Sequence, residues 1–198
     1  MDISDKKFYT IVDDLIPEEQ QVFLQKYLCE NKRFGWHFHP STITEDDQKT
    51  YEGMNINEYV QFVHSFAYYD KHTIKTEITS PFYNIIEPII KNFGKKYNYN
   101  KIKLWRAKAN LQTQSSNIIK DSHCGPHTDL WFPHHVLLYY LNDSDGDTFL
   151  FDENKNIIDR ITPKKGKAIF FNGDILHASS LPVKSKYRAV INFDMEIL

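Results

Sequence analysis

Residues 135–151, HVLLYYLNDSDGDTFLF, decide the fold of this chain. Two short apolar and aromatic runs, His135–Leu141 and Thr148–Phe151, flank the acidic stretch 142–147. Short runs of this composition, bounded by Asn, Asp and Gly, are typical of β-strands. The stretch therefore predicts two strands separated by a turn.

The same pattern of short β-like runs separated by turn-forming residues extends in both directions along the chain. Further β-like runs occur at 157–161, 167–171 and 187–195, and segments rich in Gly, Pro, Asn and Asp separate them. Upstream, a long strand begins near Lys101, where Ile102, Leu104, Arg106, Lys108 and Asn110 alternate with other residues. Many short strands at regular spacing predict a sandwich or jelly roll.

The N-terminal half has a different pattern. Phe8–Val12 predicts an edge strand, and residues 17–31 predict a helix with Asp13 and Asp14 as a candidate cap. Residues 59–69 predict a strand, and 81–97 predict a helix that Pro88 should kink or split. We expect a single domain over residues 1–198, mainly β with N-terminal helices (α+β). Residues 1–100 would supply helical support and outer strands, and 101–198 a double-stranded β-helix, the cupin-like jelly roll.

Composition limits the classes of function. The chain has 198 residues, of which 41% are hydrophobic, and a net charge of −2, so it is globular and lacks the basic excess typical of nucleic-acid binding. No apolar run is long enough to span a membrane, and the polar first residues do not look like a secretory signal. The two cysteines, Cys29 and Cys124, do not suggest a disulfide framework. We expect a cytoplasmic protein, with a nucleic-acid partner unlikely on charge alone.

A metal site is the main functional prediction. His127 and Asp129 are two residues apart, so in a strand both side chains would point to one face. His177 follows a buried-strand pattern and a tight turn, and we expect it to be exposed at the start of the next strand. Two histidines and one carboxylate on one face of an ion leave the opposite face open, as Fe(II) oxygenases require.

Arg188 begins the last strand, eleven residues after His177. A guanidinium inside a β-barrel is costly unless it meets an anion, and its planar fork suits a carboxylate. The alternative is a surface or interface arginine.

At these residues the sequence resembles the prolyl-4-hydroxylase-like branch of the 2-oxoglutarate and Fe(II)-dependent dioxygenases. Four features carry the resemblance in order: His127-x-Asp129, Tyr139-Tyr140-Leu141-Asn142, residues 146–151, and His177 followed by Arg188. The resemblance covers about half of the chain. It departs from the family at Asp145-Gly146-Asp147, where relatives often have paired glycines followed by Glu.

The resemblance implies specific roles. His127, Asp129 and His177 would bind Fe(II), and Arg188 would bind the C5 carboxylate of 2-oxoglutarate. Tyr140 and Asn110 match positions that contact the co-substrate, and Asn192 would share the face of Arg188. The activity implied is O2-dependent hydroxylation of a substrate, with 2-oxoglutarate decarboxylated to succinate and CO2. A peptidyl side chain such as proline, or a small molecule, is the expected substrate, while the oligomeric state stays open.

Alternatives remain for the whole protein and for single residues. The chain could be a cupin-like jelly roll that binds metal without oxygenase activity, or a structural jelly roll without metal. Tyr140 could be core, and Asn110 or Asn192 could bond a neighbouring loop. Five further histidines and a cysteine are expected to lie outside the iron site. His37 and His39 lack a carboxylate partner in sequence, His134 and His135 are expected at a loop end on the surface, and His123 and Cys124 in a solvated loop. The acidic residues 143–147 fail the calcium-loop pattern, since the twelfth position is Asn154 rather than Glu. Loops 41–57 and 112–126 are the expected places for a lid.

Overall fold

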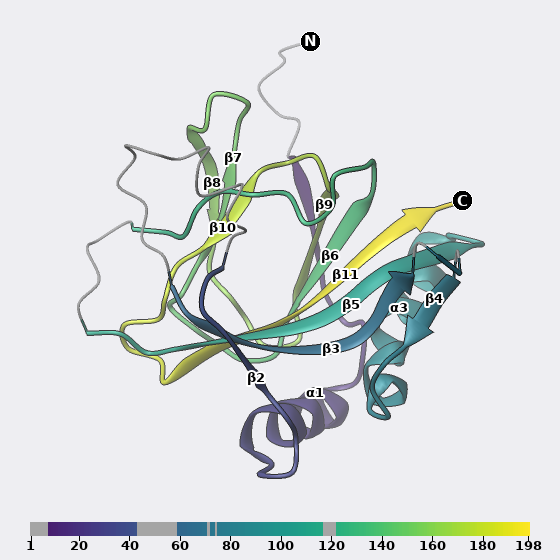
Figure 1. The fold of residues 1–198 in the computed structure, drawn as a ribbon, viewed down its shortest axis with the longest axis horizontal. Coiled ribbons are helices and arrows are strands. Elements are labelled where there is room, and N and C mark those ends of the chain that lie inside the picture. The colour runs from purple at the N-terminus through teal and green to yellow at the C-terminus, as the bar shows by residue number, and fades with distance from the viewer. Residues whose placement is uncertain (1–7, 43–58, 71, 74, 117–121) are drawn as a thin grey trace.

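Two antiparallel β-sheets form the body of the protein (Figure 1). The computed structural model describes residues 8–42, 59–70, 72–73, 75–116 and 122–198. The large sheet has the strand order β1-β9-β6-β11-β5-β3-β2, with β4 also paired to β3, and the small sheet has the order β10-β7-β8. The strands are β1 (Tyr9–Val12), β2 (His37–His39), β3 (Gln61–Asp70), β4 (Lys75–Ile78), β5 (Ile102–Thr113), β6 (His135–Tyr140), β7 (Thr148–Phe151), β8 (Ile157–Ile161), β9 (Ala168–Asn172), β10 (His177–Ser179) and β11 (Tyr187–Ile197).

Two helical segments cover one face of the large sheet. Helix α1 (Glu18–Gln25) continues into a π-helical turn, η2 (Lys26–Glu30), and α3 spans Tyr83–Tyr97. Figure 1 shows both beside the large sheet and away from β7, β8 and β10. The prediction that Pro88 could split α3 is wrong, because the helix runs through it. The cap prediction is also wrong: Pro17 is the N-cap of α1, while Asp14 has a positive φ of 58° in the preceding turn.

Alternation along the central strands divides the core into two layers. Residues Ala107, Leu137 and Ile191 pack with the helices in the main apolar cluster. Their neighbours Val136 and Val190 point the other way, into a second cluster with the small sheet. Because successive strand residues face opposite sides, every second residue of β5, β6 and β11 lies between the two sheets. That interior face holds the candidate site.

The double-layered β architecture predicted from the sequence is confirmed, with helices only in the N-terminal half. Two short strands, β2 and β4, were not predicted, since each has only three or four residues and carries no clear alternation. The strand expected to start at His177 is β10. Most of the predicted loop at 41–57, and residues 117–121 of the predicted loop at 112–126, lie outside the described residues. In the described part of the chain, no helix is long and apolar enough to cross a membrane.

Candidate metal centre

His177 is far in sequence from His127 and Asp129, yet the three side chains meet between the sheets. The ligand atoms of His127, Asp129 and His177 all lie within 4.8 Å of one another. Asp129 Oδ2 is 3.2 Å from His177 Nε2. The three residues were all predicted from the sequence, and the structure brings them together.

Their local structure differs from the prediction. His127 and Asp129 do not share a regular strand: His127 forms a single bridge with His177, through two main-chain hydrogen bonds of 3.0 Å, and Asp129 lies in the following bend. The bridge ties the loop to β10, so it sets the distance between the two imidazoles. The expectation that His177 is exposed is also wrong, since its side chain is buried against Phe171.

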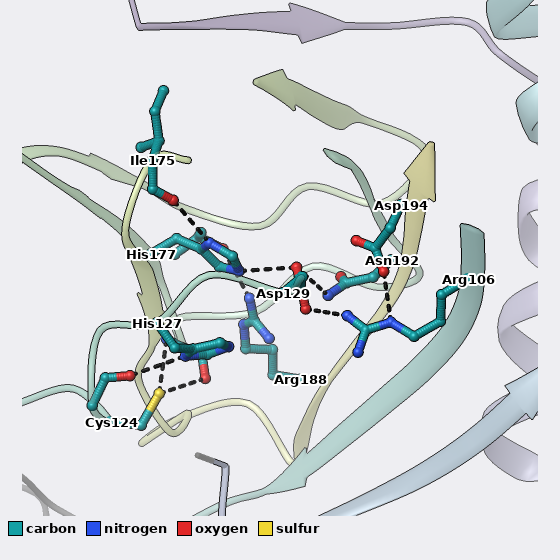
Figure 2. Close-up of polar contacts among 12 residues, drawn as sticks. Arg106, Cys124, His127, Asp129, Ile175, His177, Arg188, Asn192 and Asp194 are labelled. Atoms are coloured by element: carbon teal, nitrogen blue, oxygen red, sulfur yellow. Dashed lines mark hydrogen bonds and ion pairs between the residues drawn. The ribbon is translucent and has the colours of Figure 1, made fainter. Parts of the chain in front are cut away.

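Hydrogen bonds to the main chain orient both imidazoles (Figure 2). His127 Nδ1 donates to Gly125 O at 3.0 Å, and His177 Nδ1 donates to Ile175 O at 3.3 Å. This places the proton of each neutral ring on Nδ1 and leaves Nε2 as the ligand atom, the arrangement that metal-binding histidines usually have.

The donor set fits a divalent first-row metal ion. Ligand atoms about 2.1 Å from an ion and at right angles to one another are about 3.0 Å apart, close to the 3.2 Å between Asp129 and His177. Burial and the neighbouring His177 ring lower the pKa of His127 to about 4, so this ring is neutral and free to bind metal. Burial raises the pKa of Asp129, but Arg106, His177 and His127 together outweigh it and hold this pKa well below its usual range. Asp129 likewise overcomes burial and raises the pKa of His177, and a metal ion would displace the proton that this pair shares.

A half-buried arginine holds the carboxylate of Asp129. Arg106, on β5, donates from Nη2 to Asp129 Oδ1 and from Nε to Asp194 Oδ2 at 2.6 Å. Figure 2 shows the guanidinium between the two carboxylates. Because Oδ1 is bound to Arg106, Oδ2 is the oxygen that faces His177 and remains for an ion. Asn192 Nδ2 approaches the same oxygen at 3.5 Å.

Arg188 lies in the same pocket and is only 3% exposed. Its Nε donates to Gly146 O at 2.9 Å, and its Nη2 donates to Thr148 Oγ1 at 2.8 Å. Tyr140 also donates its hydroxyl to Thr148 Oγ1, at 3.0 Å. With two hydrogen bonds accepted, the Thr148 hydroxyl can still donate its own proton, and Arg188 Nη1 has no partner in the described part of the chain. Both groups can therefore donate to a carboxylate.

Tyr140 is one step away from this pocket. It is fully buried, does not line the pocket, and reaches it only through Thr148. Burial raises its pKa to about 12, so the hydroxyl stays protonated. Asn110 and Asn192, the other two residues predicted near the co-substrate, do line the pocket. The Oδ1 atoms of both asparagines are buried and have no hydrogen-bond partner among the described residues.

Sequence reasoning missed five polar residues of this site. Antiparallel pairing places Gln112 opposite Arg188, Lys108 opposite Asn192 and Arg106 opposite Asp194, all on the interior face. The signal was available, since the strand alternation of β5 was recognised, but nothing showed that its polar face was buried. The residues missed are Arg106, Lys108, Gln112, Thr148 and Asp194.

The remaining histidines stand apart from the metal centre. His37 and His39 are exposed on β2, and neither belongs to a potential metal-binding group within the described residues. The prediction of a solvated loop at Cys124 is wrong: Cys124 is fully buried against Phe149 and accepts a hydrogen bond from Ser179 N. His134 is buried rather than at the surface, because its ring packs over Gly173.

The acidic turn has a structural role. Asp145 accepts hydrogen bonds from the main-chain N–H groups of Val183, Lys184 and Ser185, at 2.8–3.2 Å. Although burial opposes the shift, these hydrogen bonds lower the pKa of Asp145 to about 2. The carboxylate therefore fixes the loop that leads into β11 and Arg188.

The fold was compared with known proteins. No family model and no curated protein sequence matches the chain. A 2OG-Fe(II) oxygenase-family oxidoreductase from Burkholderia pseudomallei superposes with a TM-score of 0.68 at 10% identity, covering 96% of this chain and 86% of that one. The viral collagen prolyl hydroxylase of Paramecium bursaria Chlorella virus-1, in complex with 2OG, superposes with a TM-score of 0.57 at 17% identity over both full chains.

This chain has the fold of the 2OG-Fe(II) oxygenases. The fold supports more than one reaction. The alpha-ketoglutarate-dependent epimerase of nogalamycin biosynthesis superposes with a TM-score of 0.57 at 10% identity, covering 96% of this chain and 77% of that one. The fold therefore does not determine the reaction, which has to be inferred from the residues around the candidate metal centre.

Proposed function

We propose that the protein is a non-haem Fe(II) and 2-oxoglutarate-dependent dioxygenase that hydroxylates its substrate. The observation that carries this proposal is Arg188, a buried arginine that has no carboxylate partner among the described residues. It lies in the same pocket as the triad His127, Asp129 and His177. A metal site alone would not need the arginine. A co-substrate with a chelating end and a distal carboxylate needs both.

In this proposal His127 Nε2, Asp129 Oδ2 and His177 Nε2 hold Fe(II). When bound, iron, 2-oxoglutarate and O2 supply the oxidation, in which the 2-oxo acid loses CO2 to give succinate and the substrate gains a hydroxyl group. Bidentate donation from Arg188, with help from the Thr148 hydroxyl, orients the C5 carboxylate. Asn110 and Asn192 line the same pocket, where their unpartnered amide oxygens can accept hydrogen bonds from donor groups of a ligand or of water, and Tyr140 donates to Thr148 and fixes its position.

The substrate belongs to one of two classes in this proposal: a peptidyl side chain, of the prolyl type, or a small molecule. The viral relative is a collagen prolyl hydroxylase and another structural neighbour is an epimerase in nogalamycin biosynthesis, so both classes occur on this fold. The chain's net charge of −2 gives no support to a nucleic-acid substrate.

A cupin-like metal-binding protein without oxygenase activity is the second candidate. It accounts for the triad, but it gives no reason to bury Arg188, whose desolvation is strong enough to lower the pKa of this guanidinium. Burying such a charge without an anion is unfavourable, so the first candidate explains more of the pocket.

Anaerobic titration separates the two. With Fe(II) and 2-oxoglutarate, the wild-type protein should develop the visible charge-transfer band of a chelated 2-oxo acid. His127→Ala should abolish the band by loss of metal. Arg188→Met should still bind metal but require at least tenfold more 2-oxoglutarate, as expected for loss of a charged hydrogen bond. A protein that binds Fe(II) but gives no band at saturating 2-oxoglutarate is not a dioxygenase of this kind.

A further inference from the structure

Lys108 is a half-buried cation that lines the metal pocket and that the proposed chemistry does not use. It lies on β5, pairs in register with Asn192 on β11, and lines the pocket together with His127, Asp129 and His177. Within the described residues its ammonium group makes no hydrogen bond or ion pair. A half-buried ammonium group in a narrow pocket is stabilised when an anion pairs with it.

The charges around the pocket point to an anionic partner. Among the described residues, Arg106 contacts both carboxylates, Asp129 and Asp194, and neither Arg188 nor Lys108 has an anionic partner. Three cationic side chains and a divalent metal carry five positive charges, while two carboxylates and dianionic 2-oxoglutarate carry four negative ones. The co-substrate occupies Arg188 and the metal, so the unmatched positive charge is that of Lys108.

Unpartnered amides near Lys108 support a ligand on this wall of the pocket. Gln112 is 1% exposed, lines the pocket, and neither atom of its amide has a hydrogen-bond partner among the described residues. Asn110, between Gln112 and Lys108 on the same face, has a free Oδ1. Buried polar atoms are nearly always hydrogen-bonded, so this row of β5 can bind polar atoms that the described part of the chain does not provide.

We infer that Lys108 binds a carboxylate beside the metal, separate from the carboxylate held by Arg188. This inference rests on the proposed function. Two sources have the required chemistry: an acidic group of the substrate, which the charge count favours, and the chelating carboxylate of the 2-oxo acid. An ammonium–carboxylate hydrogen bond serves both.

The experiment uses the full chain loaded with Co(II), whose visible spectrum reports ligands near the metal. Lys108→Met removes the charge at similar length, Lys108→Arg restores it, and Lys101→Met, at an exposed lysine just before β5, is the matched control. Three probes are titrated: 2-oxoglutarate; pyruvate, which has the chelating end only; and acetate added to the 2-oxoglutarate complex, as a stand-in for a substrate carboxylate. Unfolding of the metal-free variants is followed in parallel.

If Lys108 binds the chelating carboxylate, Lys108→Met weakens 2-oxoglutarate and pyruvate by the same factor, about tenfold or more. If it binds a substrate carboxylate, both affinities are kept and the saturable spectral effect of acetate is lost. Either result, restored by Lys108→Arg and absent in Lys101→Met, supports the inference, provided that the unfolding midpoint of Lys108→Met does not fall.

Unchanged binding of all three probes in Lys108→Met overturns the inference but leaves the proposed function intact. The same holds if the midpoint falls together with every affinity, since Lys108 is then structural. A wild-type protein that binds Co(II) but not 2-oxoglutarate overturns the proposed function, and the inference with it.

Discussion

Replacing Arg106 with methionine tests how the metal centre keeps its carboxylate in place. Arg106 is the only side chain among the described residues that contacts both Asp129 and Asp194, and Asp194 is completely buried. Methionine keeps much of the length and apolar volume of the stem but removes the guanidinium. Two buried carboxylates then lose their counterion at once.

The size of the effect follows from this burial. Removing one partner of a buried ion pair costs about 3–5 kcal/mol, because a charge stays buried without compensation. Protonation sets an upper limit to the free-energy cost for Asp194, because the carboxyl group can become neutral instead of remaining a buried charge. At pH 7, protonating a carboxyl whose ordinary pKa is 3.8 costs about 4.4 kcal/mol, at about 1.36 kcal/mol per pH unit. We expect Arg106→Met to lower the free energy of unfolding of the metal-free protein by about 3–4 kcal/mol.

The loss depends on pH with a defined sign. Burial raises the pKa of Asp194 to about 6 although Arg106 opposes it, so removal of Arg106 raises this pKa further. A carboxyl whose pKa is higher in the folded than in the unfolded state contributes stability at low pH and loses it as pH rises. The deficit of Arg106→Met should therefore be larger at pH 7.5 than at pH 5.

Urea unfolding of the metal-free protein at both pH values measures the deficit, and Co(II) titration measures the metal site. Supporting contacts of this kind typically change metal affinity by about 10–100-fold. The double variant Arg106→Met/Asp194→Leu should recover part of the stability, since it removes a second charge with the first. A single variant within 1 kcal/mol of wild type, or a double variant as unstable as the single one, would refute this account of the site.

Three further predictions concern other parts of the fold. In Gly146→Ala, the new Cβ would lie 2.7 Å from Ser180 O and 3.1 Å from Arg188 Cδ. Because the Arg188 side chain must then move, the affinity for 2-oxoglutarate should fall at least tenfold, while the affinity for Co(II) is kept. His64 hydrogen-bonds Gly35 O and Ser80 Oγ, and burial lowers its pKa. The stability that the neutral ring contributes is present above about pH 6.5 and is lost on acidification. Between pH 7.5 and pH 5, the melting temperature of His64→Gln should therefore fall less than that of the wild type. Asp145→Asn weakens the three main-chain hydrogen bonds that precede β11 and should cost about 1–3 kcal/mol in urea unfolding at pH 7; no change there would mean that the loop does not depend on the carboxylate.

The sequence determined the elements that have strong local patterns. Alternation and turn residues located β5, β6, β7, β8, β9 and β11 within a few positions. This is possible because side chains on the two faces of a strand alternate, which gives the sequence a period of two residues. Short strands such as β2 (His37–His39) carry too few residues for a period, and Pro88 lies in a helix that its neighbours stabilise by packing.

For the site, the sequence determined the members that chemistry alone makes conspicuous: His127, Asp129, His177 and Arg188. The structure brings the three predicted ligands together, but the reason given for the first two is wrong, since they lie in a bridge and a bend rather than in one strand. The main-chain hydrogen bonds between positions 127 and 177 do what a shared strand was expected to do.

Only the tertiary structure shows that the polar face of β5 lines a pocket. Arg106, Lys108 and Gln112 alternate with apolar residues as they would on any solvated strand, and a period of two cannot tell water from a cavity. Pairing with β11 on one side, and a second sheet stacked above, turn that face into the wall of a buried pocket. Whether a lysine on this strand faces water or an anion-binding pocket depends on which residues pack opposite it. On β5 those residues belong to β11, about eighty positions away in sequence.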